Sequence, residues 1–228
     1  MGRDPKRRQQ AAAKKKARQE RRKAARARAH GPAGDWRWGV SRSTVRNAPI
    51  HACLMTADLF KIGIGHVVIA RRLPSGEVAA GHFMVDAQCL GVKGAIFSVQ
   101  SAAAFDDVVR SLNDPYPLRE VKPAYARKLI ERSVEYAHSI GFLPHEDYHD
   151  ATAVFGDINP DDCAEEFTFG RDGKPFYVSG PRDSAQKRAL ILATLQAHCG
   201  DGNYDYLVNV GANPRRTSLG EEIQRQHE

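Results

Sequence analysis

The first thirty residues of the chain hold much of its positive charge and almost none of the side chains that a folded core needs. They contain 13 of the 34 Lys and Arg residues and two of the 27 Asp and Glu residues, a net charge of +11. The other 198 residues hold 21 basic and 25 acidic residues, a net charge of −4. The overall net charge of +7 therefore describes a basic arm joined to a mildly acidic body.

This arm has the composition of a segment that folds only on binding. Between residues 9 and 30, Ala is the only apolar residue type, and Gly, Pro and β-branched residues are absent. Such residues favour a helix once their charges are neutralised, so we expect a disordered or conditionally helical arm. Ala alone buries too little surface to drive membrane insertion or a coiled coil. The arm and its Gly/Pro linker occupy residues 1–34.

A dense run of cations is typical of nucleic-acid contact, because each cation that neutralises a phosphate releases a counterion. RNA is slightly favoured over DNA, with the ribosome among the candidate partners, since such an arm suits irregular, phosphate-dense surfaces without reading sequence. The alternative is a solubilising tail with no fixed partner. The residues predicted to contact phosphates are Lys6, Arg7, Arg8, Lys14, Lys15, Lys16, Arg18, Arg21, Arg22, Lys23, Arg26 and Arg28.

Two tryptophans, Trp36 and Trp38, follow the linker and flank Arg37. They have the chemistry to stack on unpaired bases. Docking of the two rings on the domain is the favoured interpretation, because large aromatic side chains dominate such contacts.

The rest of the chain predicts one soluble, cytoplasmic domain over residues 35–210, followed by a polar tail over 211–228. No apolar run approaches the roughly 20 residues that span a bilayer, and no apolar region of a secretory signal follows the first charges. The four cysteines stand far apart with no C-x-x-C pair, which argues against a disulfide framework and a zinc ribbon. They are Cys53, Cys89, Cys163 and Cys199.

Local patterns predict an α+β fold with a largely antiparallel sheet and three or four helices. Three strands in a meander come first, then helices that begin at Ser101 and Pro123. An Asp-Gly turn at 172–173 predicts a hairpin, and Ser184 begins a last helix before a final strand. The predicted strands cover 66–70, 78–85, 95–99, 167–169, 176–178 and 206–208.

The string from His145 to His149, HEDYH, fits H-E-x-x-H. On a helix, two histidines four residues apart face the same way and bind one zinc ion, while the Glu activates a zinc-bound water. Pro144 puts the first histidine in the opening turn of any helix, and no third ligand has a specific spacing. Two interpretations stay open: a zinc hydrolase with ligands His145 and His149 and catalytic Glu146, or a polar helix start.

A second candidate metal site is acidic. Asp157, Asp161 and Asp162 would bind magnesium together with Asp86 for phosphodiester cleavage if the fold brought them together. The same residues are also typical of turns and helix caps. Apart from such a zinc or magnesium ion, no cofactor is indicated.

Two stretches, VDAQCLGVK at 85–93 and FGRDGKPFYVSGP at 169–181, resemble those of an uncharacterised bacterial protein family. The resemblance covers most of residues 50–210 and leaves out the basic arm. It implies one recurring domain and no particular activity.

Together these patterns favour a non-enzymatic, nucleic-acid-associated protein. A metal-dependent hydrolase and a protein-interaction module localised by its tail remain the alternatives.

Overall fold

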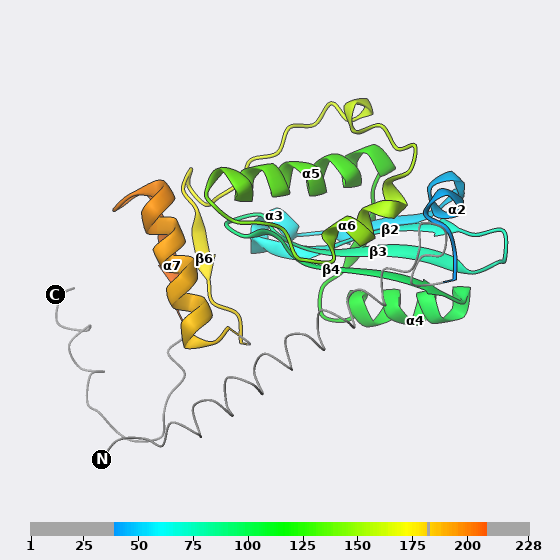
Figure 1. Cartoon of the computed structure of the whole chain (residues 1–228), viewed down its shortest axis with the longest axis horizontal. Helices are drawn as coiled ribbons and strands as arrows, with labels where there is room; N and C mark the ends of the chain where they lie inside the picture. The colour runs from blue at the N-terminus through cyan, green and yellow to red at the C-terminus, as the bar shows by residue number, and fades with distance from the viewer. Residues whose placement is uncertain (1–38, 182, 209–228) are drawn as a thin grey trace, which may run out of the picture.

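A five-stranded antiparallel sheet organises the part of the chain that the computed structural model describes, residues 39–181 and 183–208 (Figure 1). The strands lie in the order β4-β3-β2-β1-β5, and every neighbouring pair is antiparallel. The predicted α+β fold and its three-stranded meander, β2-β3-β4, are confirmed. The strands of this sheet are β1 (Ile50–Thr56), β2 (Ile64–Arg72), β3 (Val78–Asp86), β4 (Gly91–Gln100) and β5 (Leu118–Glu120).

The predicted helix starts are also confirmed. The hydroxyl of Ser101 accepts the N–H of Ala104, and that of Ser184 accepts the N–H of Lys187. Each bond satisfies one of the N–H groups that a first turn leaves without an intrahelical partner. The helices are α2 (Arg42–Asn47), α3 (Leu59–Ile62), α4 (Ala102–Asn113), α5 (Pro123–Ser139), α6 (Tyr148–Ala151) and α7 (Ala185–Cys199), with the 3-10 turns η1 (Thr152–Phe155) and η2 (Pro160–Asp162).

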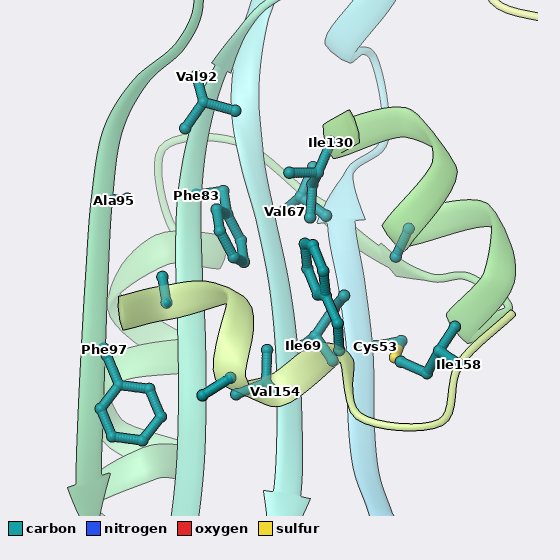
Figure 2. Close-up of a cluster of buried hydrophobic side chains, with 14 of the residues drawn as sticks. Cys53, Val67, Ile69, Phe83, Val92, Ala95, Phe97, Ile130, Val154 and Ile158 are labelled. Carbon is teal, nitrogen blue, oxygen red and sulfur yellow. The ribbon is translucent and has the colours of Figure 1, made fainter. Parts of the chain in front are cut away.

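Helices cover both faces of the sheet (Figure 1). Because side chains alternate along a strand, Val67 and Ile69 of β2 face α5, α6 and η1, while Val68 and Ala70 face α4. The first face carries the larger core, in which Phe83 of β3 lies among side chains from α5 and η1 (Figure 2). The α4 face has a smaller core, centred on Phe105 and the Val/Ala side chains beneath it.

A small C-terminal unit lies beside one end of the sheet and consists of α7, β6 (Phe176–Val178) and β7 (Asp205–Leu207) (Figure 1). Its core includes Tyr177, Ile191 and Leu195. The turn between β3 and β4 inserts Cys89 and Leu90 into this same core. The sheet and the C-terminal unit are therefore joined by a shared hydrophobic cluster.

The predicted hairpin near residue 172 is only partly right. The two-residue turn exists, with positive φ angles of 51° at Asp172 and 79° at Gly173, and the N–H of Arg171 bonds the carbonyl of Lys174 at 2.7 Å. Residues 167–169 form no strand, because Phe167 and Phe169 pack on the main core. β6 instead pairs in parallel with β7.

All four cysteines are free thiols, and three of them are buried. Cys89 and Cys199 pack in and against the C-terminal core, as expected for small apolar side chains. Burial raises the pKa of Cys53 to about 12, which keeps this thiol protonated at neutral pH.

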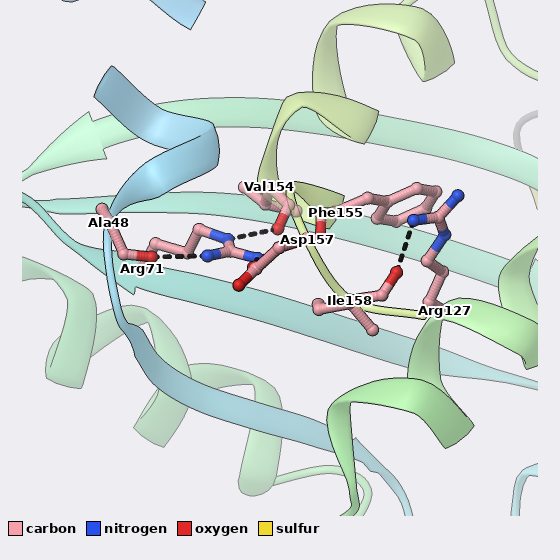
Figure 3. Close-up of polar contacts among 7 residues, drawn as sticks. All are labelled: Ala48, Arg71, Arg127, Val154, Phe155, Asp157 and Ile158. Carbon is pink, nitrogen blue, oxygen red and sulfur yellow. Dashed lines mark hydrogen bonds and ion pairs between the residues drawn. The ribbon is translucent and has the colours of Figure 1, made fainter. Parts of the chain in front are cut away.

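Arg71, at the end of β2, is a buried cation that holds three separate segments together (Figure 3). Its side chain is 2 % exposed. Nε donates to the carbonyl of Val154 at 2.6 Å, Nη2 donates to that of Phe155 at 2.9 Å, and Nη1 donates to that of Ala48. These bonds fix the end of α2 and the end of η1 onto the sheet.

An ion pair and a glycine complete this arrangement. Nη2 of Arg71 lies 2.8 Å from Oδ1 of Asp157, and the hydrogen bond from Arg71 lowers the pKa of that carboxyl. Gly156 has a φ of +50°, and a Cβ at this position would lie 2.3 Å from the carbonyl oxygen of Arg46. Only glycine therefore fits between α2 and Arg71.

The irregular segment between η1 and β6 is anchored by further cations on α5. Arg127 donates to the carbonyl of Ile158 (Figure 3), and Nζ of Lys128 donates to the carbonyl of Cys163 at 3.0 Å. Nζ of Lys128 also pairs with Glu166 at 2.7 Å. The carbonyls of this segment thus find partners without a sheet or a helix.

Within residues 39–181 and 183–208, no helix has both the length and the hydropathy that crossing a membrane requires.

Replacing Arg71 with Met is expected to lower the free energy of unfolding by about 3–5 kcal/mol, because three buried carbonyls lose their donor. The neighbouring Arg72 is exposed, so Arg72→Met is the matched control, with an expected change within about 0.5 kcal/mol. Urea denaturation followed by circular dichroism measures both. Equal stability of the two variants would contradict the anchoring role of Arg71.

Candidate functional site

A large cavity lies between the sheet and the C-terminal unit, and its volume is about 750 Å³. This volume is within the usual range for small-molecule sites. The wall is mostly apolar, with a few charged side chains. Its lining residues come from the α3–β2 connection, the ends of β3 and β4, β6 and the start of α7: Ile62, Gly63, Ile64, Met84, Asp86, Gln88, Lys93, Phe176, Val178, Ser179, Gly180, Pro181, Asp183 and Lys187.

Asp86 is a buried charged residue of this wall, at 6 % exposure. It ends β3, and its Oδ1 accepts the N–H groups of Gln88 at 3.1 Å and Cys89 at 2.9 Å. Burial raises the pKa of Asp86, while the ammonium of Lys93 and the turn N–H groups oppose that rise. The sequence predicted a turn-forming Asp here. The structure adds that the same carboxyl borders the cavity.

Lys93 of β4 reaches the same end of the cavity. Its Nζ lies 4.0 Å from Oδ2 of Asp86, a distance that allows ionic attraction and exceeds a hydrogen bond. The side chain of Lys93 is 20 % exposed, so the charge is only partly hydrated. A carboxylate and an ammonium therefore stand side by side at the border of an apolar space.

At the other side of the cavity, Asp183 organises the approach to α7. Its Oδ2 accepts the N–H of Gly180 at 2.8 Å and the hydroxyl of Tyr177 at 3.0 Å, and its Oδ1 pairs with Lys187 at 2.6 Å. Burial works to raise the pKa of Asp183, but these partners lower it overall. These contacts hold the loop between β6 and α7 against the first turn of α7.

The stretches 85–93 and 169–181 come together in the fold. The N–H of Gly170 donates to the carbonyl of Ala87, and that of Phe176 donates to the carbonyl of Gln88, both at 2.9 Å. Both stretches contribute to the cavity wall, the first through Asp86 and Lys93. Patterns far apart along the chain therefore build one site.

The HEDYH string does not lie on one continuous helix. α6 begins at Tyr148, so His145 precedes the helix, and its N–H donates to the carbonyl of Val92. The two histidines are therefore not one turn apart on a single helix face. In the described part of the chain, no group of three or more His, Cys, Asp or Glu residues is placed to hold a metal ion.

The acidic residues after Gly156 are not brought to Asp86. Asp157 pairs with Arg71, Asp162 accepts from the Asn159 side chain at 3.0 Å, and Asn159 accepts the N–H of Asp161 at 3.2 Å. These contacts form a cap and a turn beside α5. Asp86 faces the cavity, so the residues of the predicted magnesium site are divided between two places.

The predicted phosphate contacts of the arm, together with Trp36 and Trp38, lie outside the described residues. A smaller polar cavity of about 260 Å³ has a cationic lining from Arg42 and Arg46 of α2 and Arg127 of α5. Arg42 pairs with Asp150 at 2.7 Å and Arg127 with Glu131 at 2.8 Å. Within the described residues, Arg46 makes no ion pair, and its side chain is exposed.

A histidine pair stands on the α4 face of the sheet, next to the large cavity. Nε2 of His82 on β3 and Nδ1 of His66 on β2 are 2.8 Å apart, so one ring donates a hydrogen bond to the other. Burial lowers the pKa of both imidazoles, and His66 lowers that of His82 further, to about 4. Met84 follows two residues after His82 on the same face and lines the cavity.

The sequence contained only weak signals for this site. Asp86 stood out as a candidate metal ligand or turn residue, and Ser184 as the start of a helix. Ser184 does cap α7, whereas the carboxylate of Asp183 accepts hydrogen bonds from Gly180 and Tyr177. Lys93 and Lys187 resembled ordinary solvated lysines, because nothing local shows that β4 and α7 border the same space.

Comparisons with known proteins give no relative from which to transfer a role. No family model matches the chain, and neither the curated proteins nor the solved structures include a match.

The histidine pair is expected to make stability depend on pH. The unfolded chain protonates His82 near pH 6.5, whereas the folded state resists protonation until about pH 4. The neutral, buried His82 therefore makes its full contribution to the free energy of unfolding above about pH 6.5. This contribution is lost as the pH falls through 4. The urea midpoint should fall over this range, and His82→Gln should reduce the fall.

His138→Gln is the matched control, since His138 is exposed on α5. It should leave the pH dependence unchanged. If His82→Gln and the wild type show the same slope, the histidine pair is not its source.

Proposed function

We propose that this protein is a non-enzymatic, nucleic-acid-associated protein of the cytoplasm that binds phosphates through residues 1–30. The observation that carries the proposal is the separation of charge, +11 in those thirty residues against −4 in the other 198. A body with net negative charge is repelled by a polyanion, so the phosphate affinity belongs to the arm.

The surface where the described chain begins supports this assignment. α2 starts at Arg42, and it presents Arg42 and Arg46 beside Arg127 around the smaller polar cavity. Phosphate contacts that begin on the arm therefore have a place to continue on the domain. Because Arg46 is exposed and forms no ion pair among the described residues, its contact with a phosphate would break no internal contact.

The composition of the arm favours RNA as the partner, including ribosomal RNA. Its Lys and Arg residues neutralise phosphates, and it has no Asn, Ser, Thr or Tyr and only three Gln and one His before residue 31 with which to read base edges through hydrogen bonds. Irregular RNA surfaces concentrate phosphates and are recognised largely by shape. Binding without sequence preference follows.

Deleting residues 1–30 is expected to abolish binding to a structured RNA at 0.1 M salt. For the intact protein, log K should fall linearly with log salt, with a slope of about −0.7 to −0.9 for each phosphate neutralised. Fluorescence anisotropy over 50–300 mM salt measures both. A full-length chain with Gln in place of the twelve predicted phosphate-binding residues is the matched control, because it keeps the arm's length. Unchanged binding by either altered chain, or binding of the intact protein that is insensitive to salt, would argue against the proposal.

Arg46→Gln is expected to reduce the size of the salt slope by about one and to weaken RNA binding without changing the urea midpoint. Arg110 is exposed on α4, on the opposite face of the sheet, so Arg110→Gln should leave the slope unchanged. Equal slopes for the two variants would exclude α2 from the nucleic-acid surface.

A further inference from the structure

The charged end of the large cavity contains a carboxylate and an ammonium that share no hydrogen bond with each other. Backbone N–H groups of the turn, that of Leu90 included, bond the carboxylate of Asp86 from the turn side. Oδ1 of Asp86 is occupied by the N–H groups of Gln88 and Cys89. Oδ2 faces Nζ of Lys93 across 4.0 Å, with no hydrogen bond between them. Among residues 39–181 and 183–208, Lys93 has no other ionic partner. Partly buried polar atoms of this kind favour a ligand that pairs with them.

The charges select the chemistry of that ligand. A carboxylate or phosphate on the ligand would bond Lys93 but meet the carboxylate of Asp86. An ammonium would bond Asp86 but meet Lys93. A purely apolar group would leave both unpaired. A group with a hydrogen-bond donor beside an acceptor satisfies both side chains at once.

The separation of 4.0 Å favours an edge of two adjacent atoms over one bridging oxygen. A single oxygen at about 2.8 Å from both Oδ2 and Nζ would see them at an angle of about 90°, which is narrower than the tetrahedral angle an oxygen prefers between its hydrogen-bond partners. An amide or amidine edge has its donor and acceptor on separate atoms. Each atom then makes a nearly straight bond to its own partner.

The rest of the wall suits a flat ring. Ile64 and Met84 contribute apolar surface from the sheet, and Phe176 and Val178 contribute it from β6. A planar heterocycle buries both of its faces between such side chains and points its polar edge toward Asp86 and Lys93. The cavity volume of about 750 Å³ accommodates a ring with an attached sugar.

We propose that this cavity binds a nucleobase through its donor–acceptor edge, the donor bonding Oδ2 of Asp86 and the acceptor bonding Nζ of Lys93. Each nucleobase has such an edge on a planar ring, and proteins that hold extruded bases use the same combination of edge bonding and apolar walls. The proposal does not depend on the arm, which contacts phosphates only.

Isothermal titration calorimetry with the full chain tests whether the cavity binds a nucleobase. The probes are the 5′-monophosphates of guanosine, adenosine, uridine and cytidine, with ribose 5-phosphate as the probe that lacks a base. About 0.5 M salt suppresses phosphate contacts by the arm. We expect at least one nucleotide to bind and ribose 5-phosphate to fail. If no nucleotide binds at 10 mM, or if ribose 5-phosphate binds equally well, the proposal is overturned.

Asp86→Asn is the most informative variant. Its Oδ1 can still accept the Gln88 and Cys89 N–H groups that hold the turn, while an amide donor replaces Oδ2. The bound nucleotide should lose at least about tenfold in affinity, as for a charged hydrogen bond. Asp106→Asn makes the same chemical change on exposed α4 and should lose nothing.

Lys93→Met keeps the unbranched apolar part of the side chain and removes its donor. It therefore provides a second test of the site if Asp86→Asn alters the melting temperature. It too should weaken binding at least about tenfold. Unchanged affinity in a folded Asp86→Asn chain, or in Lys93→Met, overturns the assignment of the edge.

The base can come from a free nucleotide or from a nucleic-acid chain. One further titration distinguishes these two sources. A single-stranded hexanucleotide is titrated at 0.5 M salt into the intact protein and into Asp86→Asn. A loss confined to mononucleotides indicates a free nucleotide ligand. A parallel loss with the hexanucleotide indicates a base presented by a strand. If Asp86→Asn weakens neither ligand, the cavity does not hold a base.

Discussion

The contact between Arg71 and three backbone carbonyls is the interaction on which the domain's architecture depends. The segment that covers the main core, from α6 to the loop after η1, has little regular structure of its own, and its carbonyls need donors. Arg71 supplies them from the sheet, and the same residue fixes the end of α2 at Ala48. Burying a guanidinium is costly, and here its donors meet acceptors that otherwise have none. Figure 3 shows this cation beneath the loop that it holds.

A second constraint is the turn from Asp86 to Gly91. It closes the β3–β4 hairpin, and it also inserts Cys89 and Leu90 into the C-terminal core. The carbonyls of Ala87 and Gln88 bind the chain that leads to β6. One short turn therefore joins the two cores and orients Asp86 at the cavity between them. Because Asp86 stabilises the turn through Oδ1, the position of Oδ2 at the cavity is a consequence of folding.

The proposed functions follow from how charge is distributed. The arm concentrates cations where no core is needed, and this suits phosphate binding that tolerates any sequence. The cavity instead places one carboxylate and one ammonium in a mostly apolar wall, which suits selective binding of a single group. Affinity and selectivity would thus reside in separate parts of one protein.

The sequence by itself determined the three meander strands, the starts of α4, α5 and α7, and the Asp172-Gly173 turn, because alternation, caps and turn residues act locally. It did not predict β1 and β5, which are strands through their pairing with β2 and with each other. Nor did it predict that β6 pairs with β7 instead of residues 167–169. The sequence also did not predict the cavity, since Asp86, Lys93 and Lys187 lie in separate segments of the chain. Only the tertiary structure decided these features, because they depend on contacts between residues distant along the chain.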